Sequence, residues 1–145
     1  MDADFILSGS PSLEDLNLSL HALGFRRRGD RYVHPRVPFF VEFPRGPLGI
    51  GQDVQIRPVW RVRRGAKTLA LSATDSCRDR LAAFYHWRDR QSLGAAVAIA
   101  LRNRVALRKI REWSRREGHA EGFQTFLAEV ERLKTSRRRI GRSPR

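Results

Sequence analysis

The sequence has little that would cross-link the chain or anchor it in a membrane. It contains one cysteine, Cys77, so no internal disulfide can form, and the flanking Arg78 and Asp79 do not indicate a reactive thiol. The longest apolar run, residues 93–101, has about nine residues, well short of the ~20 that cross a bilayer. The first residues are acidic where a secretory signal is positively charged. We therefore expect no disulfide, no transmembrane helix and a cytoplasmic location.

Common signatures of metal and nucleotide sites are also missing. The four histidines, His21, His34, His86 and His119, are not spaced as zinc ligands usually are. The glycine-rich segment 46–51 is not followed by a Lys-Ser or Lys-Thr pair, and no helix is predicted to begin there. This excludes a Walker loop, and the segment predicts a turn instead.

Acidic residues are outnumbered, because 29 Lys and Arg face 15 Asp and Glu, which gives a net charge of +14. Such a surplus attracts phosphates, so nucleotides or nucleic acid are expected partners. The candidate nucleic-acid contacts are two clusters of arginines, Arg26, Arg27 and Arg28, and Arg61, Arg63 and Arg64. Two alternatives stay open: a GC-rich coding sequence produces the same excess of arginine over lysine, and charge runs are commonly solvated faces.

The first half of the sequence predicts strands around one helix. Residues 3–7 indicate a buried strand, and the helix that follows is expected to have Ser10 as its cap and Pro11 as its first residue. It should run to about Leu23, with Gly24 in the left-handed conformation. Further strands are predicted at residues 32–34, 39–43, 54–56, 59–62 and 68–71.

After residue 71 the apolar period becomes that of helices, which predicts about four of them. The expected fold is α+β: a small mixed sheet of about four or five strands with one N-terminal helix, followed by the C-terminal helices. We expect one domain over residues 1–136, strand-rich at 1–71 and helical at 72–136, and a basic, flexible tail at 137–145. The helical part should pack Tyr85, Trp87 and Trp113 in its core.

Carboxylates accompany two of the predicted strands. Alternation along a strand places Asp2 and Asp4 on one side of the first, and places Glu42 opposite the apolar residues of segment 39–43. If the two strands are neighbours in one sheet, the three acids converge on an oxygen-only site suited to Mg²⁺ and substrate phosphates. The alternatives are a solvated terminus for the paired acids and protection of an edge strand for Glu42.

The order of these residues resembles a known superfamily. The segment Asp2-Ala3-Asp4-Phe5, a helix, and then Val41-Glu42-Phe43 are similar to the paired-acid and third-acid motifs of nucleotidyltransferases. The run Asp79-Arg80-Leu81-Ala82-Ala83, followed by Arg88-Asp89-Arg90, resembles the helical portion of abortive-infection type nucleotidyltransferase toxins and their uncharacterised bacterial relatives. The resemblance covers residues 2 to about 133.

The resemblance implies transfer of a nucleotide from a nucleoside triphosphate to an RNA or protein acceptor, and a link to toxin and antitoxin pairs. It makes Asp2, Asp4 and Glu42 the ligands of Mg²⁺. Glu42 would also be the catalytic acid that aligns or deprotonates the attacking hydroxyl, and Arg80 would bind phosphate.

One part of the superfamily pattern is not matched. A Gly-Ser or Gly-Gly turn that packs against the triphosphate precedes the paired acids in the superfamily, whereas only Met1 precedes them here. The resemblance therefore implies a degenerate or N-terminally truncated member without robust activity. The alternative functions are a non-catalytic, basic nucleic-acid-binding module and an interaction domain that masks a partner enzyme.

Overall fold

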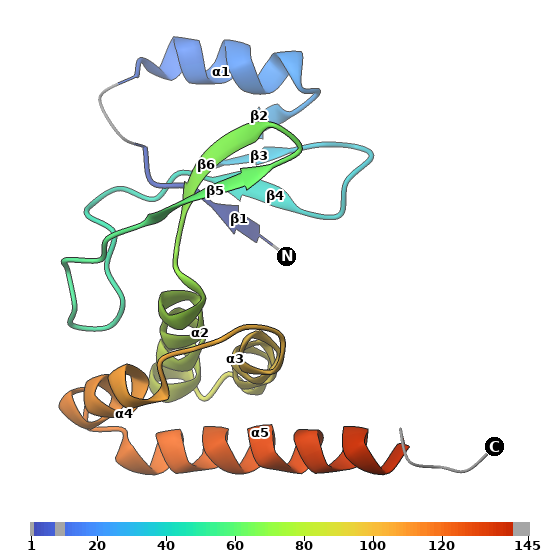
Figure 1. Ribbon diagram of the computed structural model, residues 1–145. Coiled ribbons are helices and arrows are strands. Elements are labelled where there is room, and N and C mark those ends of the chain that lie inside the picture. The colour runs from blue at the N-terminus through green and yellow to red at the C-terminus, as the bar shows by residue number, and fades with distance from the viewer. Residues whose placement is uncertain (1, 8–10, 141–145) are drawn as a thin grey trace. The chain divides into compact units, whose positions relative to one another are not determined.

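The computed structural model describes residues 2–7 and 11–140, and the side chains of 3–7 and 11–136. The described residues form five helices and six strands (Figure 1), which confirms the predicted α+β class. The chain separates into two compact units, Met1–Leu48 and Gly49–Arg145. Each unit has a hydrophobic core of its own.

The first unit combines a mixed sheet of four strands with one helix. Its elements are β1 (Asp2–Asp4), α1 (Leu13–Ala22), β2 (Arg26–Arg28), β3 (Arg31–Val33) and β4 (Phe40–Glu42). The strand order is β1-β4-β3-β2, and β1 runs parallel to β4 while the other neighbours are antiparallel. Leu16 and Leu20 of α1 pack with Tyr32 and Val41, so the helix covers one face of the sheet.

The helix α1 begins at Leu13 because Ser12 caps it. The Oγ of Ser12 accepts a hydrogen bond from the N–H of Asp15 at 3.0 Å and donates one to the Asp15 carboxylate at 2.6 Å. This reciprocal pair satisfies an otherwise unpaired N–H of the first turn. The predicted cap at Ser10 and first helical residue at Pro11 are therefore wrong, although Ser10 itself lies outside the described residues.

The other end of α1 agrees with the sequence prediction. Gly24 has a φ of +89°. Its N–H donates to the carbonyl of His21, and the N–H of Phe25 donates to that of Leu20, both at 2.9 Å. These two bonds are those of a Schellman motif, which returns the chain towards β2. A Cβ added at Gly24 would lie 2.5 Å from Nε2 of His34.

The second unit consists of a two-stranded hairpin and four helices. Its elements are β5 (Val59–Arg63), β6 (Ala66–Ala70), α2 (Ala73–Trp87), α3 (Arg90–Arg102), α4 (Leu107–Arg116) and α5 (Ala120–Ile140). The strands of the protein thus form two sheets, and the strand predicted at residues 54–56 is not formed. Residues 137–140 of the predicted tail continue α5, and residues 141–145 lie outside the described part.

The core of the second unit forms where α2, α3, α4 and α5 meet. Trp113, Phe123 and Phe126 are almost fully buried, and the hydroxyl of Tyr85 lies 2.9 Å from Oγ of Ser114. Burial of Tyr85 and Trp113 was predicted, but Trp87 is 77% exposed. It follows Tyr85 by two positions, about 200° around the helix, and therefore faces away from the core.

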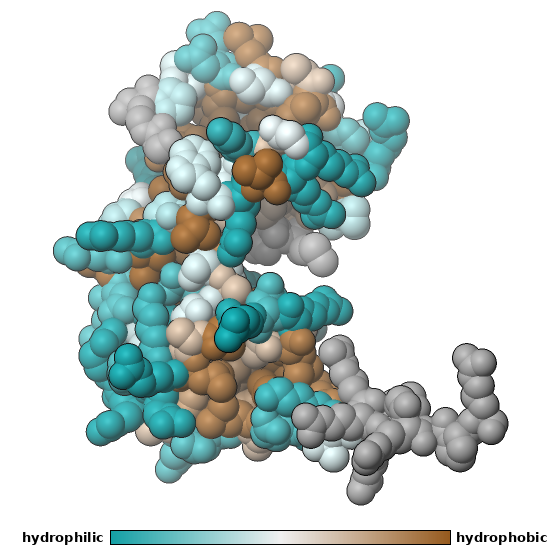
Figure 2. All heavy atoms as spheres, viewed as in Figure 1, coloured by the Kyte–Doolittle hydropathy of each residue, from teal (hydrophilic) through white to brown (hydrophobic). Residues whose placement is uncertain are grey.

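Hydrophilic and apolar side chains are distributed unevenly over one face of the protein. Figure 2 shows hydrophilic side chains over much of one face, with apolar side chains gathered on the helical part of the second unit. Within residues 2–7 and 11–140, no helix is long and apolar enough to cross a membrane.

Candidate functional sites

The first candidate site is a pair of acids on the two parallel strands of the first unit. Asp4 of β1 is in register with Glu42 of β4, and Ala3 is in register with Val41. Residues paired in this way project to the same face of a parallel sheet. Because Val41 is buried in the core, Asp4 and Glu42 project to the opposite face. Two acids that are far apart in the sequence are thus neighbours in the fold.

A basic residue lies beside this pair. Arg31 of β3 is in register with Glu42, and its Nε lies 3.9 Å from Oε1 of Glu42. The guanidinium of Arg31 also lies over the ring of Phe40, 4.7 Å from the centroid. The Glu42 side chain is 36% exposed and Asp4 is exposed, so the carboxylate face is accessible to a ligand.

The structure describes two members of the predicted magnesium set. The side chain of Asp2 lies outside the described part, although its backbone is in register with Phe40. Among the described side chains there is no cluster of three or more His, Cys, Asp or Glu that could hold a metal ion. Asp4 and Glu42 supply only oxygen, a donor set that fits Mg²⁺ when substrate phosphates supply further oxygens.

The arginines of the predicted nucleic-acid interface belong to both units. Arg26, Arg27 and Arg28 make up β2, which is an edge strand of the first unit, and all three are exposed. Arg61 and Arg63 lie on β5, and Arg64 lies in the turn to β6. These residues are also exposed.

The predicted phosphate-binding residue, Arg80, belongs to the second unit. It lies on α2, and its Nε and Nη2 donate to Oδ2 of Asp79 at 3.0 and 2.6 Å. The Arg80 side chain is 43% exposed. A role in binding phosphate stays a prediction.

Cys77 on the same helix is fully buried, and burial raises the pKa of its thiol to about 12, which keeps it protonated at neutral pH.

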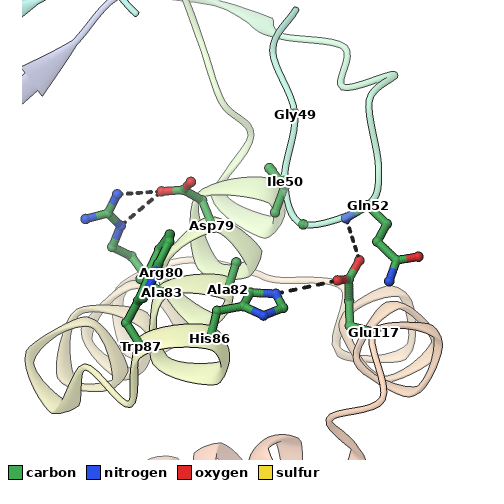
Figure 3. Close-up of a pocket in the computed structure, with 11 residues that line it drawn as sticks. Gly49, Ile50, Gln52, Asp79, Arg80, Ala82, Ala83, His86, Trp87 and Glu117 are labelled. Atoms are coloured by element: carbon green, nitrogen blue, oxygen red, sulfur yellow. Dashed lines mark hydrogen bonds and ion pairs between the residues drawn. The ribbon is translucent and has the colours of Figure 1, made fainter.

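A cavity of about 480 Å³ lies in the second unit between α2, the end of α4 and the loop before the hairpin (Figure 3). Its lining comprises Gly49, Ile50, Gly51, Gln52, Asp79, Arg80, Ala82, Ala83, His86, Trp87 and Glu117. The lining thus combines charged, aromatic and small residues.

Glu117 ties the loop to the helices at one end of the cavity. It is 8% exposed, and its Oε1 accepts a hydrogen bond from the N–H of Gln52 at 2.8 Å. Its Oε2 has no hydrogen-bond partner and lies 3.7 Å from Nε2 of His86. A Cβ at Gly51, where φ is +58°, would lie 2.6 Å from the carboxylate. The close approach of loop and carboxylate therefore requires glycine.

Ion pairs centred on the buried Arg78 form a second anchor for this loop. Arg78 is 1% exposed and donates to the carboxylate of Asp53 in the loop and to that of Asp75, the latter at 2.8 Å. Arg116 binds Asp53 at 3.0 Å, and Lys109 binds Asp75 at 3.2 Å. Loop, α2 and α4 are thus held together by one network, which gives these residues a structural role.

Sequence reasoning did not find the cavity. The hydrogen bond from Gln52 to Glu117 joins residues that are distant in the sequence and share no motif, so no local pattern predicts it. Trp60 was also missed, although the sequence around it contains a pattern that indicates an exposed apolar residue. Alternation of apolar and basic residues in Trp60–Arg63 indicates a strand with one apolar face, and no element of the predicted fold was assigned to cover that face.

No protein-family model, no curated protein and no solved structure matches this chain. The chain is therefore described by the features of its own structure. The chain is an α+β protein with a carboxylate pair on adjacent parallel strands in one unit, and with a hairpin, a helical core and a cavity in the other.

Proposed function

We propose that the chain binds a magnesium complex of a nucleoside triphosphate at Asp4 and Glu42, as a nucleotidyltransferase-like protein. The observation that carries the proposal is the parallel pairing that puts Asp4 in register with Glu42. A parallel pair whose other face is packed in the core presents both carboxylates side by side on the open face. This is the arrangement that the resemblance requires of the acids that hold the metal.

The residues of the site have distinct roles in this proposal. Asp4 and Glu42 hold Mg²⁺, which supplies charge neutralisation for the phosphates. Glu42 also accepts a hydrogen bond from the attacking hydroxyl of an RNA or protein acceptor and aligns it. Arg31, whose Nε lies 3.9 Å from Oε1 of Glu42, restrains the orientation of this carboxylate. The buried, unpaired Cys77 fits a reducing compartment such as the cytoplasm.

Calorimetric titration with ATP or GTP, in the presence and absence of Mg²⁺, tests this proposal. We expect binding that needs Mg²⁺ in the wild type and is lost in Asp4→Asn and Glu42→Gln, because each variant removes a negative oxygen ligand. Asp30→Asn is the matched control, since Asp30 is exposed and lies in the turn between β2 and β3 of the same unit.

Two outcomes contradict the proposal. One is the absence of binding to any nucleoside triphosphate by folded wild-type protein. The other is binding that Asp4→Asn and Asp30→Asn weaken equally, since the carboxylates would then act only through net charge.

A further inference from the structure

The hairpin of β5 and β6 has two chemically different faces. Trp60 pairs with Leu69 and Val62 pairs with Lys67, so these four residues share one face. Arg61 pairs with Thr68 on the other face. Alternation along both strands therefore separates a mostly apolar face from a basic one.

The apolar face is largely uncovered. Trp60 is 67% exposed, Val62 is 66% exposed and Leu69 is 44% exposed. A two-stranded hairpin is marginally stable in water when it stands alone, and contiguous exposed apolar side chains mark sites of interaction. A ligand that covers Trp60 and its neighbours would remove this area from water.

The charge of the segment identifies the kind of ligand. The sequence between Asp53 and Asp75 has no acidic residue, and it contains Arg57, Arg61, Arg63, Arg64 and Lys67. Arg64 occupies the turn with a φ of +49°, a conformation in which Asn or Gly is usual. A cation is thus present at the tip of the hairpin at some conformational cost. A polyanion complements this surface.

We propose that the β5–β6 hairpin binds single-stranded nucleic acid. The exposed indole of Trp60 provides a surface on which an unpaired base stacks, with Val62 and Leu69 extending the contact. Lys67, which shares this face, and Arg64 in the turn contact the phosphates that follow. A single strand fits better than a duplex, because bases stacked within a duplex do not offer their faces to a side chain. This binding does not depend on the acid pair of the first unit.

Fluorescence anisotropy with a short, fluorescein-labelled oligouridine RNA at low salt tests the role of Trp60. We expect Trp60→Ala to weaken binding by about 5- to 150-fold, the usual effect of losing one stacked base, and Trp60→Phe to retain most of the affinity. Trp87→Ala is the matched control, since Trp87 on α2 is also exposed, at 77%. Circular dichroism of each variant confirms that the fold is kept.

The phosphate contacts are tested by the salt dependence of the same binding. Replacing Arg64 and Lys67 together with Ser should reduce the slope of log K against log salt by about 1.4, because each contact to a single strand contributes about 0.7. The control replaces Arg104 and Arg115, which are exposed elsewhere in the second unit, and changes the net charge equally. Its slope should stay close to that of the wild type.

Three results overturn the inference. The first is equal affinity of Trp60→Ala and Trp87→Ala for the RNA. The second is tighter binding to a duplex than to the single strand, with an affinity that does not change in Trp60→Ala. The third is self-association through the hairpin without RNA binding. The last would assign the apolar face to a second copy of the chain. The acid pair of the first unit is not part of the hairpin, so this test stands or fails independently of the nucleotide site.

Discussion

At the scale of single residues, Gly24 combines a backbone and a packing requirement. An L residue is strained at its φ of +89°, and a Cβ would meet the ring of His34 at 2.5 Å. We expect Gly24→Ala to lower the free energy of unfolding by more than about 1 kcal/mol, measured by urea denaturation with circular dichroism. Gly29→Ala is the control, because Gly29 has a φ of +61° with nothing near its Cβ position.

The comparison of the two variants separates two causes. Gly29→Ala has the conformational cost alone, so its effect should be the smaller of the two. Equal effects would show that His34 moves aside without cost and would contradict the packing part of the prediction.

Single residues also show which parts of the sites were readable from sequence. That Asp4 and Glu42 project from the face opposite to the apolar residues was predictable, because successive residues of a strand alternate between its faces. Glu117 was not, since its importance comes from the approach of a loop that is distant in sequence. Trp87 was misjudged because an aromatic residue at the last position of a helix was assigned to the core without regard to its angle around the axis.

At the scale of elements, the attachment of the loop to α2 depends on Arg78. Its guanidinium is buried, bridges Asp53 and Asp75, and lies over the ring of Trp113 at 4.9 Å from the centroid. Without Arg78, Asp75 keeps Lys109 and Asp53 keeps Arg116, so each carboxylate loses one of its cationic partners. We expect Arg78→Met to lower the free energy of unfolding by about 1–3 kcal/mol in urea denaturation. Arg132→Met is the control: it breaks only the exposed ion pair with Glu129 and should change the free energy of unfolding by less than ~1 kcal/mol.

The same variant has an expected pH dependence. Burial by itself raises the pKa of Asp75, but hydrogen bonds from Ser72, Arg78 and Lys109 outweigh it and the net pKa is lowered. A lowered pKa stabilises the fold above the ordinary value of 3.8, and this contribution is lost as pH falls through the folded pKa. Without Arg78 the pKa of Asp75 should rise, so acid unfolding should begin at a higher pH. An unchanged acid transition would contradict this role.

Elements were predictable where the signal is local. The helices of the second unit follow from apolar periodicity, and the end of α1 follows from Gly24. The start of α1 was misplaced because several residues near it are suitable caps, and only the bond between Ser12 and Asp15 decides between them. The pairing of β1 with β4 is long-range, so apolar patterns alone did not fix it. The two strands of the hairpin were each predicted, but their separation from the first sheet was not.

At the scale of the whole molecule, the two units differ in the size of their cores. The first unit buries Leu20, Tyr32 and Val41 almost completely, whereas the second has a much larger set of buried apolar residues centred on Trp113 and Phe126. Burial of apolar area is the dominant favourable term in folding, and small domains are marginal because they bury little of it. The second unit is therefore expected to supply most of the stability of the chain.

A fragment containing residues 49–145 tests this expectation. It retains the helical core, both anchors of the cavity loop and the hairpin, so it should fold alone, with a helical circular dichroism spectrum and a cooperative urea transition. It should also keep the affinity for oligouridine RNA, while Mg²⁺-dependent nucleotide binding should require the full chain, because Asp4 and Glu42 lie in the first unit. A fragment without a cooperative transition would show that its core depends on the first unit. A folded fragment that binds nucleotide as the full chain does would contradict the assignment of that site to the acid pair.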